Sequence, residues 1–264
     1  MAQITASAVK QLREMTAQGM MECKKALTEA NGDIQAAVDL LRKWGMVKVE
    51  KKAARETKEG LIGIARSGNS ASMVEVSTET DFCARNDVFR AMVEQVAQLA
   101  LQGPDGAVAE SQPIHDAVQA AFDKIGENMK FVRGVKMTAP LVGSYKHHNN
   151  KVGVLLAIDG EVDTATLNDV CMHIAFADPL AVSPDQVSPE LVERERRIAQ
   201  EQAAESGKPP AIVEKMVTGK VNKFLAENAL LEQPFVRDDK KKVKEVLGNA
   251  KVLSFARFAI GQAQ

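Results

Sequence analysis

The chain has 264 residues, with 34 Lys plus Arg against 35 Asp plus Glu, which gives a formal net charge of -1. The length allows more than one folded unit, and the balanced charge gives no general attraction to nucleic acid or to an anionic membrane, so we expect neither as a partner. No run of about 18 apolar residues predicts a membrane span. Cys23, Cys83 and Cys171 are few, odd in number and far apart, which indicates free thiols and a cytoplasmic protein.

The first 43 residues predict three short helices. Asn31-Gly32 should end the second helix, and Asp33 is a suitable N-cap for the third. We expect a three-helix domain with its linker at residues 1–54, because residues 48–59 are charged and lack an apolar stripe. The apolar positions at helical spacing are Ala8, Leu12 and Met15, then Met20, Cys23 and Leu27, and then Ile34, Ala37, Val38 and Leu41.

The remaining sequence reads as two diverged copies of one plan: a β-hairpin, a helix and a late strand. In the first copy the strands are expected at 61–66, 73–78 and near 131–137, with a helix across 89–100. In the second copy they are expected at 141–146, 151–158 and 252–260, with a helix across 167–174. The fold class is therefore α+β, with two related subdomains at 55–139 and 140–264 that hold small antiparallel sheets.

The second copy carries an insertion at about 188–235. Residues 191–205 and 211–227 have helical patterns, and the sequence SGKPP at 206–210 breaks them. The apolar content of both helices is low, so they can bury little surface. We expect an antiparallel helical hairpin that projects from the body.

No pattern of residues predicts an enzyme. The chain has no Gly-rich phosphate loop, no H-E-x-x-H and no C-x-x-C. Cys171 and His173 lie two apart on one predicted helix, so they cannot bind one metal together, and the adjacent His147 and His148 should point to opposite faces of a strand. Cys83 lacks an evident base. We expect no metal, no cofactor and no covalent chemistry, and three buried or half-buried thiols.

The segment STETDFCARND at 77–87 leaves a strand and enters a helix, for which Asn86 or Asp87 is a plausible N-cap. It places Phe82 in a polar connection. On composition alone the preferred interpretation is that Phe82 folds back onto the sheet as part of the core. The alternative is an exposed aromatic side chain that fills a pocket on a partner, as binding hot spots do.

Several motifs together resemble bacterial elongation factor Ts. Their order and spacing match from near the N-terminus to about residue 260. The resemblance implies a ubiquitin-associated-like N-terminal domain, two related α+β subdomains and a projecting antiparallel coiled coil. It also implies binding to the GDP form of elongation factor Tu and faster GDP release. The motifs are TAQGMMECKKAL at 16–27, EANGD at 29–33, TDF at 80–82, KIGEN at 124–128, GSYKH at 143–147, MH at 172–173, SGKP at 206–209 and QPFV at 233–236.

The resemblance also implies roles for individual residues. Phe82 should enter a pocket of the GTPase domain and disturb Mg²⁺ coordination, with Thr80, Asp81 and Cys83 completing the segment. The remaining contacts implied for the partner are Arg13, Met20, Met21 and Lys24 in the N-terminal domain, Ile125 and Gly126 beside Phe82, and His147 in the second subdomain.

Simpler interpretations stand beside these roles. Arg13 and Lys24 could be solvated charges, Met20 could be half buried, Gly126 could end a helix and His147 could flank a turn. Two features depart from the family pattern. Cys83 replaces the usual Val, and the sequence stops at Gln264, so the contacts of a C-terminal helix found in many members are not carried over.

Two rival functions account for parts of the sequence. One is a ubiquitin-associated-type adaptor that binds through Met20 and Met21, which leaves the α+β core without a purpose. The other is a thiol-dependent enzyme centred on Cys83. Replacing Cys83 with Ser would separate the second from an exchange factor, because only the thiol enzyme would lose its activity.

Overall fold

The computed structural model describes residues 4–16, 20–41, 56–205 and 209–262, with the backbone alone at 13–16. Contacts between Cα atoms divide the chain into one unit at Met1–Glu56 and another at Thr57–Gln264. The predicted linker at 48–59 and the predicted break at 206–210 lie partly outside the described residues.

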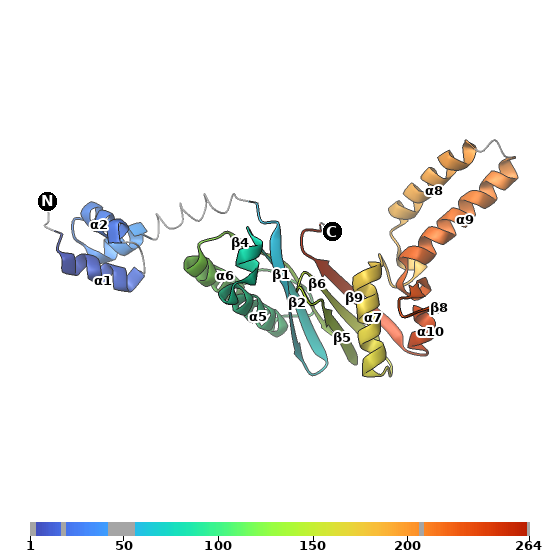
Figure 1. Cartoon of the computed structure of the whole chain (residues 1–264), viewed down its shortest axis with the longest axis horizontal. Coiled ribbons are helices and arrows are strands. Elements are labelled where there is room, and N and C mark those ends of the chain that lie inside the picture. Colours follow the sequence, from blue (N-terminus) through green and yellow to red (C-terminus); the bar gives the residue numbers. More distant parts are fainter. Residues whose placement is uncertain (1–3, 17–19, 42–55, 206–208, 263–264) are drawn as a thin grey trace. The chain divides into compact units, whose positions relative to one another are not determined.

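The N-terminal unit contains the three expected helices (Figure 1): α1 (Ala6–Thr16), α2 (Met20–Glu29) and helical residues 34–41. Asn31 and Gly32 have φ of 51° and 89°, so the chain turns through the left-handed region directly after α2. Asp33 accepts a hydrogen bond from the backbone N–H of Ala36 at 3.0 Å, as an N-cap does. The core of this unit includes Leu12, Cys23, Ala26, Leu27, Ala37 and Leu41.

The first sheet of the larger unit has the strand order β1-β2-β4-β3, and all its pairs are antiparallel. Its strands are β1 (Glu59–Ser67), β2 (Ser70–Thr78), β3 (Gly106–Val108) and β4 (Met129–Thr138). The helices of this half are α4 (Asp81–Arg85), α5 (Asp87–Gln102) and α6 (Gln112–Ile125).

The second sheet repeats the plan, with the order β5-β6-β9 and antiparallel pairs throughout. In both sheets a hairpin comes first and a late strand follows, as predicted, and the late strand pairs with the second strand of the hairpin. The strands are β5 (Leu141–Lys146), β6 (Val152–Asp159) and β9 (Lys251–Ala259). The other elements are α7 (Thr164–Ala177), η1 (Pro184–Gln186), η2 (Leu230–Glu232), β7 (Pro234–Phe235), β8 (Asp238–Lys242) and α10 (Val243–Leu247).

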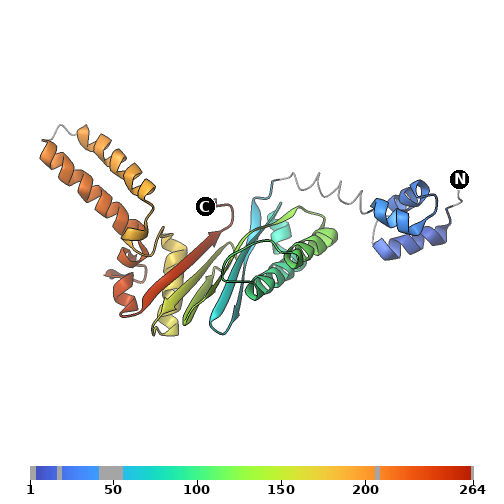
Figure 2. The same ribbon diagram turned by 180° about the vertical axis from the view of Figure 1, so that it is seen from behind.

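The two sheets pack against each other, and helices cover the outer face of each (Figure 2). Gly153 of β6 lies where the two sheets come close together, because an added Cβ would come within 2.5 Å of Ile62 Cγ2 and 2.8 Å of Met73 Sδ. β6 is apolar nearly throughout, whereas β2 is buried along its length and still carries the polar residues Ser72, Glu75, Ser77 and Thr78. The residues between the sheets include Ile62, Ala71, Met73, Val142, Leu155, Ala157 and Phe258.

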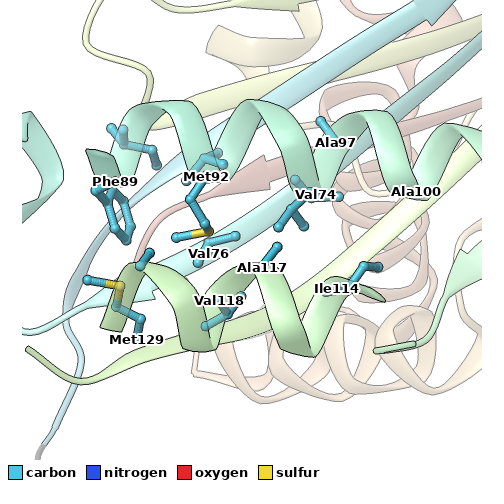
Figure 3. Packing of buried hydrophobic residues seen from close by; sticks show 14 of the residues in the cluster. Val74, Val76, Phe89, Met92, Ala97, Ala100, Ile114, Ala117, Val118 and Met129 are labelled. Atoms are coloured by element: carbon cyan, nitrogen blue, oxygen red, sulfur yellow. The ribbon is translucent and has the colours of Figure 1, made fainter. Parts of the chain in front are cut away.

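The outer face of the first sheet forms a core with α5 and α6 (Figure 3). Phe89 is fully buried at the start of α5, and its side chain lies beside Met92 above the sheet. The last α5 positions in this core are Ala97 and Ala100. This core holds β1, β2, α5 and α6 together. The short helix α4 lies next to it in the chain and leads directly into α5.

The helical hairpin consists of α8 (Pro189–Ala204) and α9 (Pro210–Asn228), which extend away from the sheets (Figure 1). Its small core, with Ala199, Ala203, Val217 and Val221 at the centre, is separate from the sheet cores. The projecting hairpin and the α+β class are thus confirmed. No helix in the described part of the chain is long and apolar enough to cross a membrane.

Candidate functional site

Phe82 projects from the first turn of α4 with 79% of its surface exposed. The interpretation that Phe82 folds back into the core is therefore wrong. The predicted loop is also more ordered than expected, because Asp81–Arg85 forms a short helix between β2 and α5. Successive helical residues point about 100° apart, so Cys83 and Ala84 face the core while Phe82 faces outward.

Both ends of α4 are set by capping residues. Thr80 is the N-cap, with extended backbone angles and a side-chain oxygen that accepts from the Cys83 N–H at 3.1 Å. Asn86 ends α4, and its side chain accepts from the Val88 N–H at 2.8 Å and so begins α5. The prediction of Asn86 as an N-cap is confirmed. The backbone segment that carries Phe82 is consequently held by a capping residue at each end.

The outer surface of α4 is charged. Arg85 Nη2 lies 2.9 Å from Asp81 Oδ2, an i, i+4 pair on an exposed helix face. A cavity of about 330 Å³ adjoins this face. It is lined by Asp81, Ala84, Arg85 and Arg90 on one side, by Glu59 and Leu61 of β1, and by residues 148–151 of the β5–β6 turn. The site thus brings α4 close to the turn that follows His147.

The end of α6 reaches the same place. Gly126 has φ of 81° and donates its N–H to the Phe122 carbonyl at 2.7 Å, so it ends α6 in the left-handed conformation that favours glycine. Ile125 packs against the core beneath α5. The next residue, Glu127, has both carboxylate oxygens 3.0 Å from Thr80 Oγ1. The structure therefore joins the Thr80–Cys83 segment to the Ile125–Gly126 segment.

The N-terminal candidates lie on the surface of their own unit. Met20 is 60% exposed and Met21 is 75% exposed, and Lys24 is also exposed. The interpretation of Met20 as half buried is wrong, and the predicted apolar face of α2 begins at Cys23 instead. Arg13 belongs to α1, but its side chain lies outside the described residues.

His147 follows β5 and is half buried, with Nδ1 2.8 Å from the hydroxyl of Tyr145. The expectation that His147 and His148 point to opposite faces is wrong, because their ring centroids are only 4.2 Å apart. Alternation of side chains holds within a strand, but these residues belong to the turn between β5 and β6.

The cysteines do not form a reactive site. All three thiols are buried, as predicted, and none of them forms a disulfide. Burial raises the pKa of the Cys83 thiol, and it raises the pKa of Cys171 to about 12. A thiol with a raised pKa is a poor nucleophile near neutral pH, which argues against an enzyme centred on Cys83. Among the residues that the structure describes, no group of three or more His, Cys, Asp or Glu side chains could hold a metal ion.

Comparison with known proteins places the chain in a family. A sequence model described as Elongation factor TS matches residues 79–262. Elongation factor Ts of Gluconobacter oxydans is 44% identical over 282 residues, which cover 99% of this chain and 93% of that protein. The chain belongs to the elongation factor Ts family. Elongation factor Ts of Brucella anthropi and of Thioalkalivibrio sulfidiphilus are 44% and 43% identical, each over 98% of this chain and over 93% and 92% of their own lengths.

Membership of the elongation factor Ts family confirms the resemblance and makes the chain a translation elongation factor. The matched range includes Thr80–Cys83, Ile125, Gly126 and His147, and the full-length relatives extend the match over the N-terminal unit. Glu79 and Glu127, whose carboxylates border the Phe82 segment, were not among the predicted site residues. Glu127 lies in the KIGEN motif at 124–128, but the hydrogen bonds join residues 49 and 47 positions apart, so no local pattern could have indicated these contacts.

Proposed function

We propose that this protein is a guanine-nucleotide exchange factor that binds elongation factor Tu in its GDP form and accelerates GDP release. The observation that carries the proposal is Phe82, a large aromatic side chain that is 79% exposed on a short capped helix. A side chain of this size exposed in the free protein suits insertion into a pocket on a partner. Membership of the elongation factor Ts family supports elongation factor Tu as that partner.

The free energy of Phe82 insertion limits what it can do alone. Full burial of a Phe side chain contributes roughly 1.5–3 kcal/mol. A rigid capped helix reduces the entropy lost on binding, but one side chain cannot hold a partner and also displace its nucleotide. A wider interface must supply the remaining binding energy.

We propose that three patches supply this wider interface: the N-terminal unit, the end of α6 and the β5–β6 turn. Two methionines, Met20 and Met21, give the N-terminal unit an exposed apolar surface next to Lys24. The assignment of all three patches rests on the family resemblance. The proposed contacts are Arg13, Met20, Met21 and Lys24 in the N-terminal unit, Ile125 and Gly126 at the end of α6, and His147 beside the β5–β6 turn. We further propose that the chain divides into domains at 1–54, 55–139 and 140–264.

The route to GDP release runs through the Mg²⁺ of the partner. Mg²⁺ requires nearly ideal octahedral coordination, so a small shift of the loops that hold it weakens its binding. GDP phosphates without the ion are poorly neutralised and leave faster. By linkage, the two ligands weaken each other equally: bound exchange factor raises the dissociation constant of GDP by the same ratio as bound GDP raises that of the exchange factor. The protein itself makes and breaks no covalent bond, and we place its action in the cytoplasm, where translation elongation occurs.

The experiment is to mix this protein with elongation factor Tu that carries a fluorescent GDP and to follow release at several Mg²⁺ concentrations. We expect release to accelerate, with a larger acceleration when Mg²⁺ is present than after the ion is chelated, because chelation already removes what the factor disturbs. An unchanged release rate would sink the proposal and leave the adaptor function of Met20 and Met21 as the better account.

A further inference from the structure

Two carboxylates connect the Phe82 helix to the end of α6. Glu127 accepts the Thr80 hydroxyl proton, with both carboxylate oxygens 3.0 Å from Thr80 Oγ1. Glu79 accepts the backbone N–H of Asn128 at 2.6 Å. Each of the two segments, 79–80 and 127–128, therefore donates one hydrogen bond to a carboxylate of the other. We call these two hydrogen-bonded connections the carboxylate clamp.

The clamp determines how α4 is capped. A hydroxyl has one proton to donate and lone pairs to accept with. Because Thr80 gives its proton to Glu127, the same oxygen presents a lone pair to the Cys83 N–H, which lies 3.1 Å away. One Thr80 hydroxyl thus orders two segments, and the charge on Glu127 strengthens its bond.

Phe82 depends on this arrangement because α4 has only five residues. A helix of that length is unstable alone, so its geometry comes from its caps and from the packing of Cys83 and Ala84 against the core. Phe82 itself is almost fully exposed and does not help to hold α4 in place. Its direction is therefore set by the N-cap and by what fixes the N-cap.

We propose that Glu127 is a positioning residue for nucleotide exchange, which aims Phe82 at the partner by fixing the Thr80 hydroxyl. The inference rests on the proposed function. It predicts that Glu127 acts only through Phe82. Loss of the Glu127 carboxylate therefore lowers the rate of GDP release within the complex, while the other contact patches keep the affinity for elongation factor Tu.

The test measures GDP release as a function of exchange-factor concentration for the unaltered chain, Glu127→Ala, Phe82→Ala and the double variant. Glu94→Ala is the matched control, because Glu94 is exposed on α5 and outside the contact patches. We expect Glu127→Ala to lower the saturating rate by about fivefold, the factor for loss of one helix cap, with little change in the half-saturating concentration. In the Phe82→Ala background, Glu127→Ala should cause no further loss.

Two additional variants distinguish positioning from simple destabilisation. Glu127→Gln keeps an oxygen that can accept the Thr80 proton, so it should retain most of the rate. Thr80→Val removes this hydrogen bond together with the α4 cap that Thr80 provides to the Cys83 N–H, so it should lower the rate at least as much as Glu127→Ala does. All rates are expressed per folded protein, with the folded fraction taken from thermal melts.

The outcomes separate this inference from the proposed function. If Phe82→Ala slows GDP release but Glu127→Ala does not, or if their two reductions multiply, the positioning role is overturned and the proposed function stands. If Phe82→Ala releases GDP as fast as the unaltered chain, the proposed function itself is overturned, and the positioning role with it.

Discussion

Phe82 and Cys83 are adjacent in the chain and have opposite surroundings: Phe82 is 79% exposed and Cys83 is 3% exposed. The turn of α4 produces this difference, because it points Cys83 into the core formed with α5 and α6 and points Phe82 to solvent. The residue that we assign to the partner is thereby separated from the residue that anchors its helix. Changes at the two positions should have different consequences.

The stability of the chain should not depend on Phe82. Phe82→Ala removes an exposed side chain, and such changes alter the free energy of unfolding by at most about 0.5 kcal/mol. Phe89→Ala is the matched control, because Phe89 is fully buried in the α5 core, and its loss should cost about 3–5 kcal/mol. Thermal and urea unfolding of both variants measure this difference. A Phe82→Ala variant as unstable as Phe89→Ala would mean that Phe82 belongs to the core.

The Cys83 thiol should resist chemical modification. Burial raises its pKa, so both access and thiolate formation are disfavoured near pH 7.5. We expect an alkylating reagent to modify Cys83 in the native protein far more slowly than in denaturant, as followed by mass spectrometry of the peptides. Cys83→Ser should keep the exchange activity of its folded fraction. Rapid modification of native Cys83 with loss of activity would instead support the thiol enzyme.

The pair of Arg133 and Glu75 should be important for the packing of the two sheets. Arg133 Nε lies 2.7 Å from Glu75 Oε2, and its guanidinium lies 4.4 Å from the ring centre of Phe258 in the second sheet. Arg133→Met leaves a buried carboxylate without its partner and should cost about 3 kcal/mol. Unfolding in urea measures the loss. Glu75→Gln in the Arg133→Met background should recover part of it, and additive losses would contradict the pairing.

The same variant should alter the pH dependence of stability. Burial already raises the pKa of Glu75, against the opposing effect of Arg133. Without Arg133 the pKa rises further, so the folded state binds more protons than the unfolded state above the ordinary Glu pKa of 4.5. The stability of Arg133→Met relative to the unaltered chain should therefore fall as the pH rises from about 5 to 7. A pH-independent difference would contradict this account.

The buried His173 should make the chain sensitive to acid. Its Nδ1 accepts from the Val236 N–H at 3.2 Å, so Nε2 carries the proton and donates to Gln233 Oε1 at 2.9 Å. Burial lowers its pKa from 6.5. The unfolded chain therefore binds the additional proton first, and stability should fall as the pH drops below about 6.5.

Comparison with His173→Gln tests this expectation. The amide can accept from Val236 and donate to Gln233 but does not titrate, so this variant should lose less stability between pH 6.5 and 5 than the unaltered chain does. Urea unfolding at several pH values gives the comparison. Identical pH profiles for the two proteins would show that His173 is not responsible.

Elements with strong periodicity could be predicted from the sequence. The α5 stripe of Phe89, Met92, Val93 and Val96 and the alternation of Val154, Leu156 and Ile158 in β6 each repeat at the period of their structure. One long element was missed: α6 has 14 residues, and only Gly126 as a possible helix end pointed to it. The other missed elements are short, since β3, α4, α10 and the β7–β8 hairpin have strands or helices of two to five residues each. Too few turns or alternations fit into such segments to give a period, and tertiary contacts decide their structure.

The candidate site shows the same limit. Asn86 could be identified as a cap because its partner is two residues away. Composition and pattern could not indicate the exposure of Phe82, because it depends on the direction in which Cys83 and Ala84 enter the core; only the resemblance to elongation factor Ts implied it. The interpretation that Phe82 was buried followed from its composition and was wrong. The Thr80–Glu127 contact could not be predicted from the sequence either, because it joins two segments that only the folded sheet brings together.

The most direct test of the central claim is the rate of fluorescent GDP release from elongation factor Tu at saturating concentrations of the unaltered chain and of Phe82→Ala, with Mg²⁺ present. We predict that Phe82→Ala, although as stable as the unaltered chain, loses most of the acceleration of GDP release. If folded Phe82→Ala accelerates release as well as the unaltered chain, Phe82 is not the residue that displaces the nucleotide.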